Sequence, residues 1–325
     1  MQLPSLEDLD RATQIVRTVL PPTPQYTWPL LNQRSGVEVW VKHENHSPVG
    51  AFKLRGAVVY MEWLKNSGVA ATGVIAATRG NHGQGVALAA ARMGLRSTIV
   101  VPHGNSREKN RAMRALGAEL IEHGEDFQAA LEHAGLLAME RGLHMIPSFH
   151  PLLVHGTGTY ALEMLAAVAA LDAIYVPIGL GSSICGVIAV RNALGLKTRV
   201  VGVVAAAAPA YALSFRAGRA ISHAAESRLA DGLSCRTPVP EALEVIRENV
   251  DHVVEVSEQE IAAAMRAYYE DTHNIAEGAA AAALAGLLRE REALQGKRVG
   301  VVLTGGNVDR EVFLEALGGD GAREW

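Results

Sequence analysis

Short apolar segments alternate with helical segments along most of this chain. Residues 73–77 read Gly-Val-Ile-Ala-Ala, and the segments 97–101 and 199–204 are nearly as apolar. Strands that are apolar on both faces occur in parallel sheets that helices cover on each side. We therefore predict an α/β fold of parallel sheets. The predicted strands cover 37–41, 73–77, 97–101, 118–121, 144–146, 173–176, 199–204, 252–256 and 299–303, and the predicted helices cover 6–20, 52–64, 83–93, 108–116, 126–141, 157–170, 183–194, 257–270 and 277–291.

The length of the chain is suited to two domains. It has 325 residues, and a domain usually contains about 100–200. Because 49% of the residues are apolar, the chain can bury a large core. The strand–helix alternation runs without a break through 67–154 and then starts again, so we expect 67–154 to form a small domain.

Charge and cysteine content exclude several classes of protein. The net charge is −4 with histidine neutral, and no long basic run is present, so we expect no nucleic-acid partner. Two cysteines, Cys185 and Cys235, cannot form a disulfide framework. The N-terminus lacks the pattern of a signal peptide, and no apolar run reaches about 18 residues. We expect a cytoplasmic protein with no membrane partner.

Lys53 stands in the first turn of a predicted helix, behind a Pro-Val-Gly turn at 48–50. The helix dipole is positive at this end and disfavours a cation. This placement favours a neutral, nucleophilic amine that could form a Schiff base with an aldehyde cofactor. Taken alone, the residue is better explained as a solvated surface lysine, since single motif matches have a high false-positive rate.

A glycine loop at 179–183 lies between a predicted strand and a predicted helix. Its backbone N–H groups and the helix N-terminus form an anion site, to which Ser182 and Ser183 add hydroxyl donors. A dinucleotide fingerprint would need a third small residue and an acidic residue about 20 positions later. Ile184 occupies the third position, and the next strand ends in Val-Val-Ala at 203–205. The loop therefore suits a single phosphate, although a plain strand–helix turn would also explain its glycines.

Two further loops follow predicted strands. Thr-Arg-Gly-Asn-His at 78–82 comes after strand 73–77, and Thr304 comes after strand 299–303. The carboxyl ends of parallel strands are the edge at which ligands bind. Ordinary turn and capping roles remain the alternative for both loops.

Four segments together resemble the pyridoxal-phosphate-dependent serine/threonine dehydratase family. They appear in the family's order and extend over nearly the whole chain: Ser47–Ala57, Thr78–Gly85, Gly179–Ser183 and Thr304–Asp309. The resemblance implies two parallel-sheet domains of the tryptophan-synthase-β-like type, known as fold type II, with the cofactor in the cleft between them. It assigns 1–66 and 155–325 to a large cofactor-binding domain and 67–154 to a small substrate-loop domain, and it implies a homodimer.

The same resemblance implies a role for each loop. Lys53 would hold pyridoxal 5'-phosphate and, once freed, remove the α-proton of the substrate. Relatives often carry a serine where this chain has Arg79. The implied cofactor-binding residues are Phe52, Lys53, Asn81 at the ring oxygen, Gly179, Leu180, Gly181, Ser182 and Ser183 at the phosphate, and Thr304 at the pyridine nitrogen; the implied substrate-binding residues are Thr78, Arg79, Gly80, Asn81 and His82.

The resemblance implies an ammonia-lyase that converts a β-hydroxy-α-amino acid, by default L-threonine or L-serine, to a 2-oxo acid and ammonia. The alternatives are a lyase for 3-hydroxyaspartate or phenylserine, an amino-acid racemase, a non-catalytic carrier of the cofactor, or a nucleotide-binding module. We expect no metal site, because Val204–Ala210 has no oxygen-bearing side chain and His-Glu-Asn-His at 43–46 lacks the zinc spacing. Since the chain ends soon after the last motif, we expect no appended regulatory domain.

Overall fold

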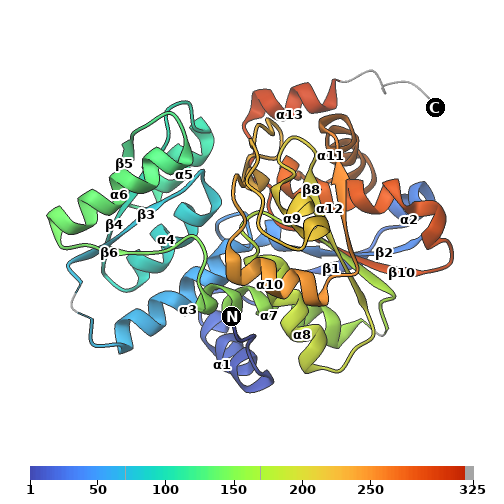
Figure 1. Cartoon of the computed structure of the whole chain (residues 1–325), viewed down its shortest axis with the longest axis horizontal. Helices are drawn as coiled ribbons and strands as arrows, with labels where there is room; N and C mark the ends of the chain where they lie inside the picture. The colour runs from blue at the N-terminus through green and yellow to red at the C-terminus, as the bar shows by residue number, and fades with distance from the viewer. Residues whose placement is uncertain (70, 169, 319–325) are drawn as a thin grey trace.

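Two separate sheets, each with helices on both faces, form the two lobes of the molecule (Figure 1). The computed structural model describes residues 1–69, 71–168 and 170–318. The larger sheet has six strands in the order β1-β2-β10-β7-β8-β9, and the smaller has four in the order β5-β4-β3-β6. Every pair of neighbouring strands is parallel except β1 with β2. The fold is therefore the α/β class that the apolar strands predict.

The elements follow one another along the chain with short connections. The strands are β1 (Gln25–Thr27), β2 (Glu38–His43), β3 (Gly73–Ala77), β4 (Arg96–Val101), β5 (Glu119–Glu122), β6 (His144–Met145), β7 (Ala173–Pro177), β8 (Arg199–Ala205), β9 (His252–Val256) and β10 (Arg298–Leu303). The helices are α1 (Leu6–Arg17), α2 (Pro29–Ser35), α3 (Lys53–Asn66), α4 (Asn81–Arg92), α5 (Arg107–Ala115), α6 (Phe127–Arg141), α7 (Pro151–Ala167), α8 (Ser182–Ala193), α9 (Ala210–Ala217), α10 (Pro240–Asn249), α11 (Glu258–Thr272), α12 (Gly278–Arg289) and α13 (Arg310–Leu317), with short 3₁₀ helices η1 (Glu44–His46), η2 (Asp231–Leu233) and η3 (Arg291–Leu294).

Each predicted strand and helix is present, with ends shifted by a few residues. The largest shift is in α7, which begins at Pro151 rather than 157 because the side chain of His150 accepts the Leu152 N–H and caps the helix. The elements missed are β1, α2, α9, α10 and α13. These elements have only three to ten residues, so their apolar period is too short to read.

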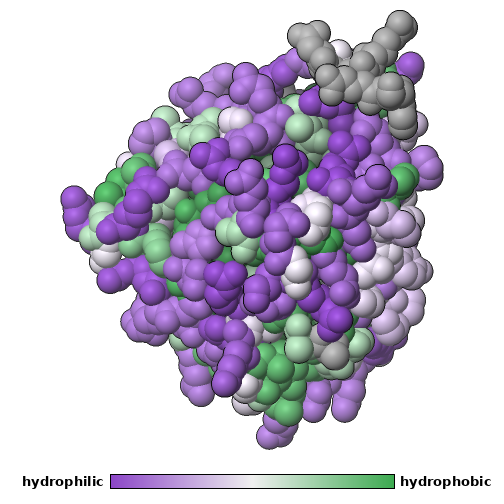
Figure 2. All heavy atoms as spheres, turned by 90° about the vertical axis from the view of Figure 1, so that its right-hand side faces the viewer, coloured by the Kyte–Doolittle hydropathy of each residue, from purple (hydrophilic) through white to green (hydrophobic). Residues whose placement is uncertain are grey.

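The core divides between the faces of the two sheets. Helices α11 and α12 pack in one apolar cluster on the larger sheet, and α7, α8 and α10 pack in another that includes Ile174 and Val176 of β7. Helices α3 and α4 share a cluster with one face of the smaller sheet, and α6 packs on its other face. Hydrophilic side chains cover most of the face in Figure 2, which agrees with a core that lies inside the lobes.

Helix α3 runs between the lobes and carries Lys53 at its first position. Two glycines on neighbouring helices let their backbones approach it. A side chain on Gly156 of α7 would come within 2.3 Å of the Arg55 carbonyl oxygen, and one on Gly85 of α4 would come within 3.1 Å of the Lys53 carbonyl oxygen. The start of α3 is therefore held against both lobes. In the described part of the chain, no helix is both long enough and apolar enough to cross a membrane.

Candidate active site

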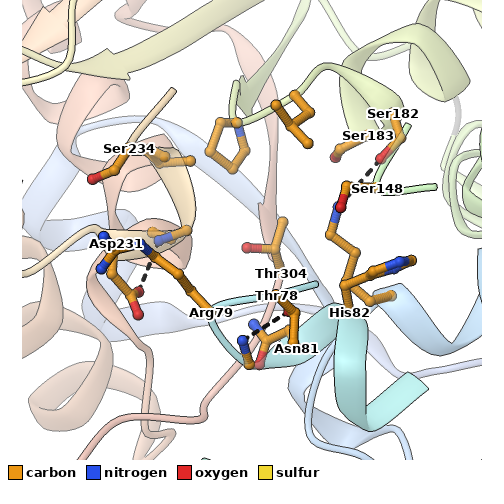
Figure 3. A pocket seen from close by; sticks show the side chains of 18 of the residues that line it. Thr78, Arg79, Asn81, His82, Ser148, Ser182, Ser183, Asp231, Ser234 and Thr304 are labelled. Atoms are coloured by element: carbon orange, nitrogen blue, oxygen red, sulfur yellow. Dashed lines mark hydrogen bonds between the residues drawn. The ribbon is translucent and has the colours of Figure 1, made fainter. Parts of the chain in front are cut away.

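One cavity lies at the carboxyl ends of β3, β7 and β10, between the two sheets. Figure 3 shows Ser182 and Ser183 at one end of it and Asp231 and Ser234 at the other. The cavity brings together each predicted site residue, namely Phe52, Lys53, Thr78, Arg79, Gly80, Asn81, His82, Gly179, Leu180, Gly181, Ser182, Ser183 and Thr304. Segments far apart in the sequence thus meet in one place, although the role of each residue remains a prediction.

The amine of Lys53 faces this cavity. Its Nζ lies 3.4 Å from Oγ of Ser182 and 4.7 Å from the centroid of the Phe52 ring. Burial lowers the pKa of Lys53 to about 8, and the negative charge of Glu277 opposes the shift. A neutral amine is therefore accessible near neutral pH, as the sequence predicts, and burial is the main cause of the lowered pKa.

The glycine loop lies at the start of α8 and lines the cavity. The first backbone N–H groups of this 12-residue helix have no partner within the helix and point to the cavity end. Gly181 has φ 104°, and a side chain on it would come within 2.7 Å of Ala242. The Ser183 hydroxyl is 2.6 Å from the Tyr160 hydroxyl, and Thr157 donates to the Ser182 carbonyl. Hydrogen bonds from two residues of α7 thus hold the loop in place.

The loop at 78–82 is shaped by the Thr78 hydroxyl, which accepts the N–H groups of Gly80 and Gly83 at 2.9 and 3.3 Å. Gly80 has φ 150°, and a side chain there would come within 2.3 Å of Cδ of Lys109. Only glycine fits between this turn and the lysine. The loop therefore brings the N-terminus of α4 to the cavity.

Asn81 has both ends of its amide engaged. Its Nδ2 donates to Oε1 of Glu277 at 2.6 Å, and its Oδ1 accepts from Nδ2 of Asn307 at 2.9 Å. Asn307 also donates to the Val49 carbonyl, which ties the motif around Gly306 to the lysine loop. One N–H of Asn81 remains for a ligand.

Thr304 lies at the end of β10 and is buried against the cavity. Its carbonyl accepts the Phe52 N–H at 2.9 Å, so the residue before Lys53 is pinned to the central strand of the larger sheet. The Phe52 ring meets Tyr160 edge to face at 6.2 Å between centroids. Thr304 thus presents a neutral hydroxyl, and not a carboxylate, at this wall of the cavity.

Sequence reasoning missed three charged residues in the cavity wall. Lys109 of α5 pairs with Asp231 at 3.0 Å and with Glu277 at 3.2 Å. The only signal was a turn-forming Asp-Gly at 231–232 within an irregular region. Glu277 precedes an alanine-rich helix, and Lys109 sits in an ordinary charged helix, so neither stands out before the lobes are placed together.

Arg79 lines the cavity and also a second, polar cavity on the other side of Lys109. It is half-buried. In the ranges that the structure describes, no hydrogen bond or ion pair is found for its guanidinium. The carboxylates Asp231 and Glu277 across the cleft are taken by Lys109 instead.

A family model described as pyridoxal-phosphate dependent enzyme matches residues 16–305. The chain belongs to this family. Among its relatives, L-threo-3-hydroxyaspartate ammonia-lyase of Saccharomyces cerevisiae is 33% identical over 98% of this chain and 98% of its own. L-threonine ammonia-lyase of Thermotoga maritima is 34% identical over 94% of this chain and 76% of its own. The structure of maize serine racemase, at 27% identity, covers 97% of each chain with a TM-score of 0.90. The fold is thus that of fold type II enzymes.

The cofactor of this pyridoxal-phosphate-dependent enzyme is pyridoxal 5'-phosphate, and the residues of the cavity fit it. Lys53 supplies an amine with a lowered pKa, caused by burial. The loop at 179–183 supplies donors for a phosphate without a charged side chain. Nε2 of His82, which lines the same cavity, is buried with no hydrogen-bond partner in the described ranges. Burial, together with the charge of Lys53, lowers the pKa of this imidazole to about 3, so it is neutral beside a ligand.

Proposed function

We propose that this chain is an ammonia-lyase that converts a β-hydroxy-α-amino acid, with L-threonine or L-serine as default substrates, to a 2-oxo acid and ammonia. The observation that carries the proposal is the pairing of Lys53, whose pKa burial lowers to about 8, with an uncharged anion loop in one cavity. The ammonia-lyases among the relatives support it.

Four groups of the chain would divide the work. Bound pyridoxal 5'-phosphate supplies the electron withdrawal that acidifies the α-carbon of an attached amino acid. Lys53 would hold the cofactor and then take the α-proton at Nζ. The loop at 179–183 would hold the phosphate, and Thr78 with its loop would hold the substrate carboxylate. Thr304 would offer the ring nitrogen a neutral partner, which would favour prompt loss of the β-hydroxyl from the bound substrate.

We also propose a division of labour between the lobes. Residues 67–154 would form the small substrate-loop domain, and 1–66 with 155–325 the large cofactor-binding domain. The separate four-stranded sheet supports this boundary. Helix α3 lies in the apolar cluster of the smaller sheet, so it would act as the joint between them. By family resemblance the enzyme would be a cytoplasmic homodimer, which sedimentation of the purified protein would test.

The test compares the wild type with Lys53→Ala in a panel of β-hydroxy amino acids, assayed for ammonia and 2-oxo acid. The wild type should be yellow and release both products, and the variant should release neither while keeping its circular dichroism. A yellow wild type that converts none of the panel would favour a non-catalytic carrier. A colourless wild type in the presence of cofactor would favour a nucleotide module.

A second candidate substrate is 3-hydroxyaspartate, favoured by the guanidinium of Arg79, which lines the cavity and has no ion pair among the described residues. Arginine binds a carboxylate with two parallel hydrogen bonds. Losing a hydrogen bond to a charged group costs about 1.5–3 kcal/mol, a factor of about ten to more than a hundred in affinity. Arg79→Ser should therefore raise KM more for 3-hydroxyaspartate than for threonine. A KM that the substitution leaves unchanged for every substrate would place Arg79 outside the site.

Arg79 also bears on the racemase alternative. A guanidinium keeps its proton at ordinary pH and cannot exchange one with the α-carbon. Racemisation by the wild type should therefore be negligible. Chiral chromatography of unreacted L-serine measures it directly, and rapid appearance of D-serine would reverse the assignment.

A further inference from the structure

A continuous line of polar contacts crosses the cleft beside Lys53. Asp231 of η2 contacts Lys109 of α5 at 3.0 Å, and Lys109 contacts Glu277 at 3.2 Å. Glu277 accepts from Asn81 at 2.6 Å, and Asn81 accepts from Asn307 at 2.9 Å. Lys109 and Asn81 come from the smaller sheet's helices, and the other three residues come from the larger lobe. The line therefore exists only when the lobes are together.

The charged members of this line are buried. The side chains of Lys109 and Glu277 are 7% and 4% exposed. Burial acts against the charged form of Lys109, but Glu277 and Asp231 outweigh it and raise its pKa. Burial raises the pKa of Glu277, and Lys109 opposes that shift. The Asp231 carboxylate also raises the pKa of Glu277, and the remaining charged group nearby is Lys53, whose own pKa is lowered. Lys109 is thus the cation that most favours the ionised form of this carboxylate.

An ionised carboxylate accepts hydrogen bonds and donates none. Glu277 therefore requires the NH₂ end of the Asn81 amide, and the NH₂ of Asn307 requires the oxygen end. The two partners fix one orientation of the amide. In that orientation the remaining hydrogen of Nδ2 is available to the cavity, so Asn81 can only donate to a ligand from this end.

We propose that Glu277 and Lys109 are positioning residues that make Asn81 a hydrogen-bond donor toward the ring oxygen of the cofactor. The inference rests on the cofactor contact proposed for Asn81. Lys109 acts through the charge of Glu277, and Glu277 acts through the amide of Asn81. Neither needs to touch the substrate.

The test reads the visible absorption of the lysine-bound cofactor against pH. A donated hydrogen bond stabilises the anionic ring oxygen, and its loss makes the oxygen more basic. Asn81→Ala should therefore move the midpoint of the titration upward by about one pH unit. Glu277→Gln and Lys109→Met should each move it in the same direction by a smaller amount. Lys109→Arg, which keeps the cation, should restore most of the wild-type midpoint.

The matched control is Arg236→Met, which removes an exposed ion pair across the same cleft, 3.1 Å from Asp126. It should leave the midpoint unchanged. The double variant Lys109→Met with Glu277→Gln should move the midpoint no further than either single variant. Each substitution already removes the same effect, the charge of Glu277 acting on the Asn81 amide. The positioning role of Glu277 and Lys109 would be overturned by additive shifts in the double variant or by an equal shift in the control. It would also be overturned if Asn81→Ala were the only variant to shift the midpoint. An unchanged midpoint in Asn81→Ala would overturn the proposed cofactor contact of Asn81, and with it the positioning role of Glu277 and Lys109.

Discussion

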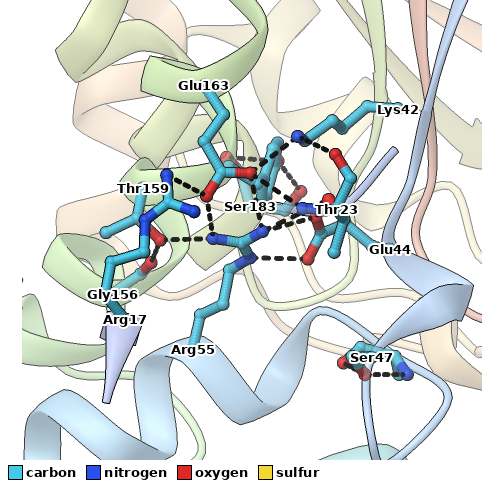
Figure 4. A network of polar contacts seen from close by, with 12 residues as sticks. Arg17, Thr23, Lys42, Glu44, Ser47, Arg55, Gly156, Thr159, Glu163 and Ser183 are labelled. Atoms are coloured by element: carbon cyan, nitrogen blue, oxygen red, sulfur yellow. Dashed lines mark hydrogen bonds and ion pairs between the residues drawn. The ribbon is translucent and has the colours of Figure 1, made fainter. Parts of the chain in front are cut away.

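Replacing Arg55 by methionine should destabilise the fold by about 3–5 kcal/mol, because it leaves buried carboxylates without their cation. Arg55 lies two residues beyond Lys53 in α3 and is fully buried. Its guanidinium donates to Glu44 at 2.7 and 3.0 Å and to both oxygens of Glu163 at 2.9 Å (Figure 4). These contacts join the start of α3 to η1 and α7.

The magnitude depends on what each carboxylate retains. Glu163 keeps Lys42 at 2.6 Å and Arg17 at 3.3 Å. Glu44, which is fully buried, keeps as its hydrogen-bond partner among the described residues only the hydroxyl of Thr23, at 2.6 Å. The loss is therefore concentrated on one uncompensated carboxylate, which sets the estimate of about 3–5 kcal/mol. At this chain length that corresponds to a fall of roughly 4–7 °C in the unfolding midpoint.

Thermal and urea unfolding of the cofactor-loaded protein measure this loss. The control is Arg11→Met, which removes an exposed pair with Glu7 and should cost less than about 1 kcal/mol. Adding Glu44→Gln to Arg55→Met should recover part of the loss, since it removes the stranded charge. A loss below about 1 kcal/mol in the single variant, or no recovery in the double variant, would refute the reasoning.

Three further predictions concern the site. Thr304→Asp should keep the ring nitrogen protonated and strengthen its electron withdrawal, so elimination should slow and a transamination by-product should become detectable by chromatography. Chelator-treated enzyme should keep its activity, because Val204–Ala208 ends β8 and begins the next loop without an oxygen-bearing side chain; strong stimulation by magnesium would contradict this. Since the pKa of Lys53 is lowered to about 8 by burial, the neutral fraction rises with pH. The rate at which cofactor-free protein recaptures pyridoxal 5'-phosphate should therefore increase through pH 8 and then level off, as measured by stopped-flow absorbance.

The parts of the site that follow strands were readable from the sequence. The loops at 78–82 and 179–183 and Thr304 all come directly after apolar segments, and parallel strands bring such ends to one edge. Lys53 could be singled out because a turn and a helix start surround it. Local pattern and sheet topology place these residues at one sheet edge, whereas their assignment to a common site came from the family resemblance of the four segments.

The charged wall of the cavity could not be predicted in this way. Lys109 meets Glu277 and Asp231 only because α5 of one lobe faces η2 and the start of α12 in the other. That approach depends on the packing of two lobes, and no local pattern encodes it. The same limit applies to Arg79, which lines the same cavity as Asp231 and Glu277 but pairs with neither in the described ranges. Lys109 forms the ion pairs with those carboxylates, and no sequence pattern indicates that Lys109 rather than Arg79 is their partner.

Lys53 and Arg55 show that surroundings, rather than helix position, decide which buried cation keeps its charge. Both stand in the first turn of α3, where the helix dipole disfavours a positive group equally. Arg55 is held by two carboxylates in a fork geometry, and its pKa stays above its usual value although burial opposes this. Lys53 has no ion pair within the described ranges and feels Glu277 only at a distance, so burial prevails and its pKa falls. The chain thus anchors the helix with one cation and leaves the other ready to lose its proton at the cavity.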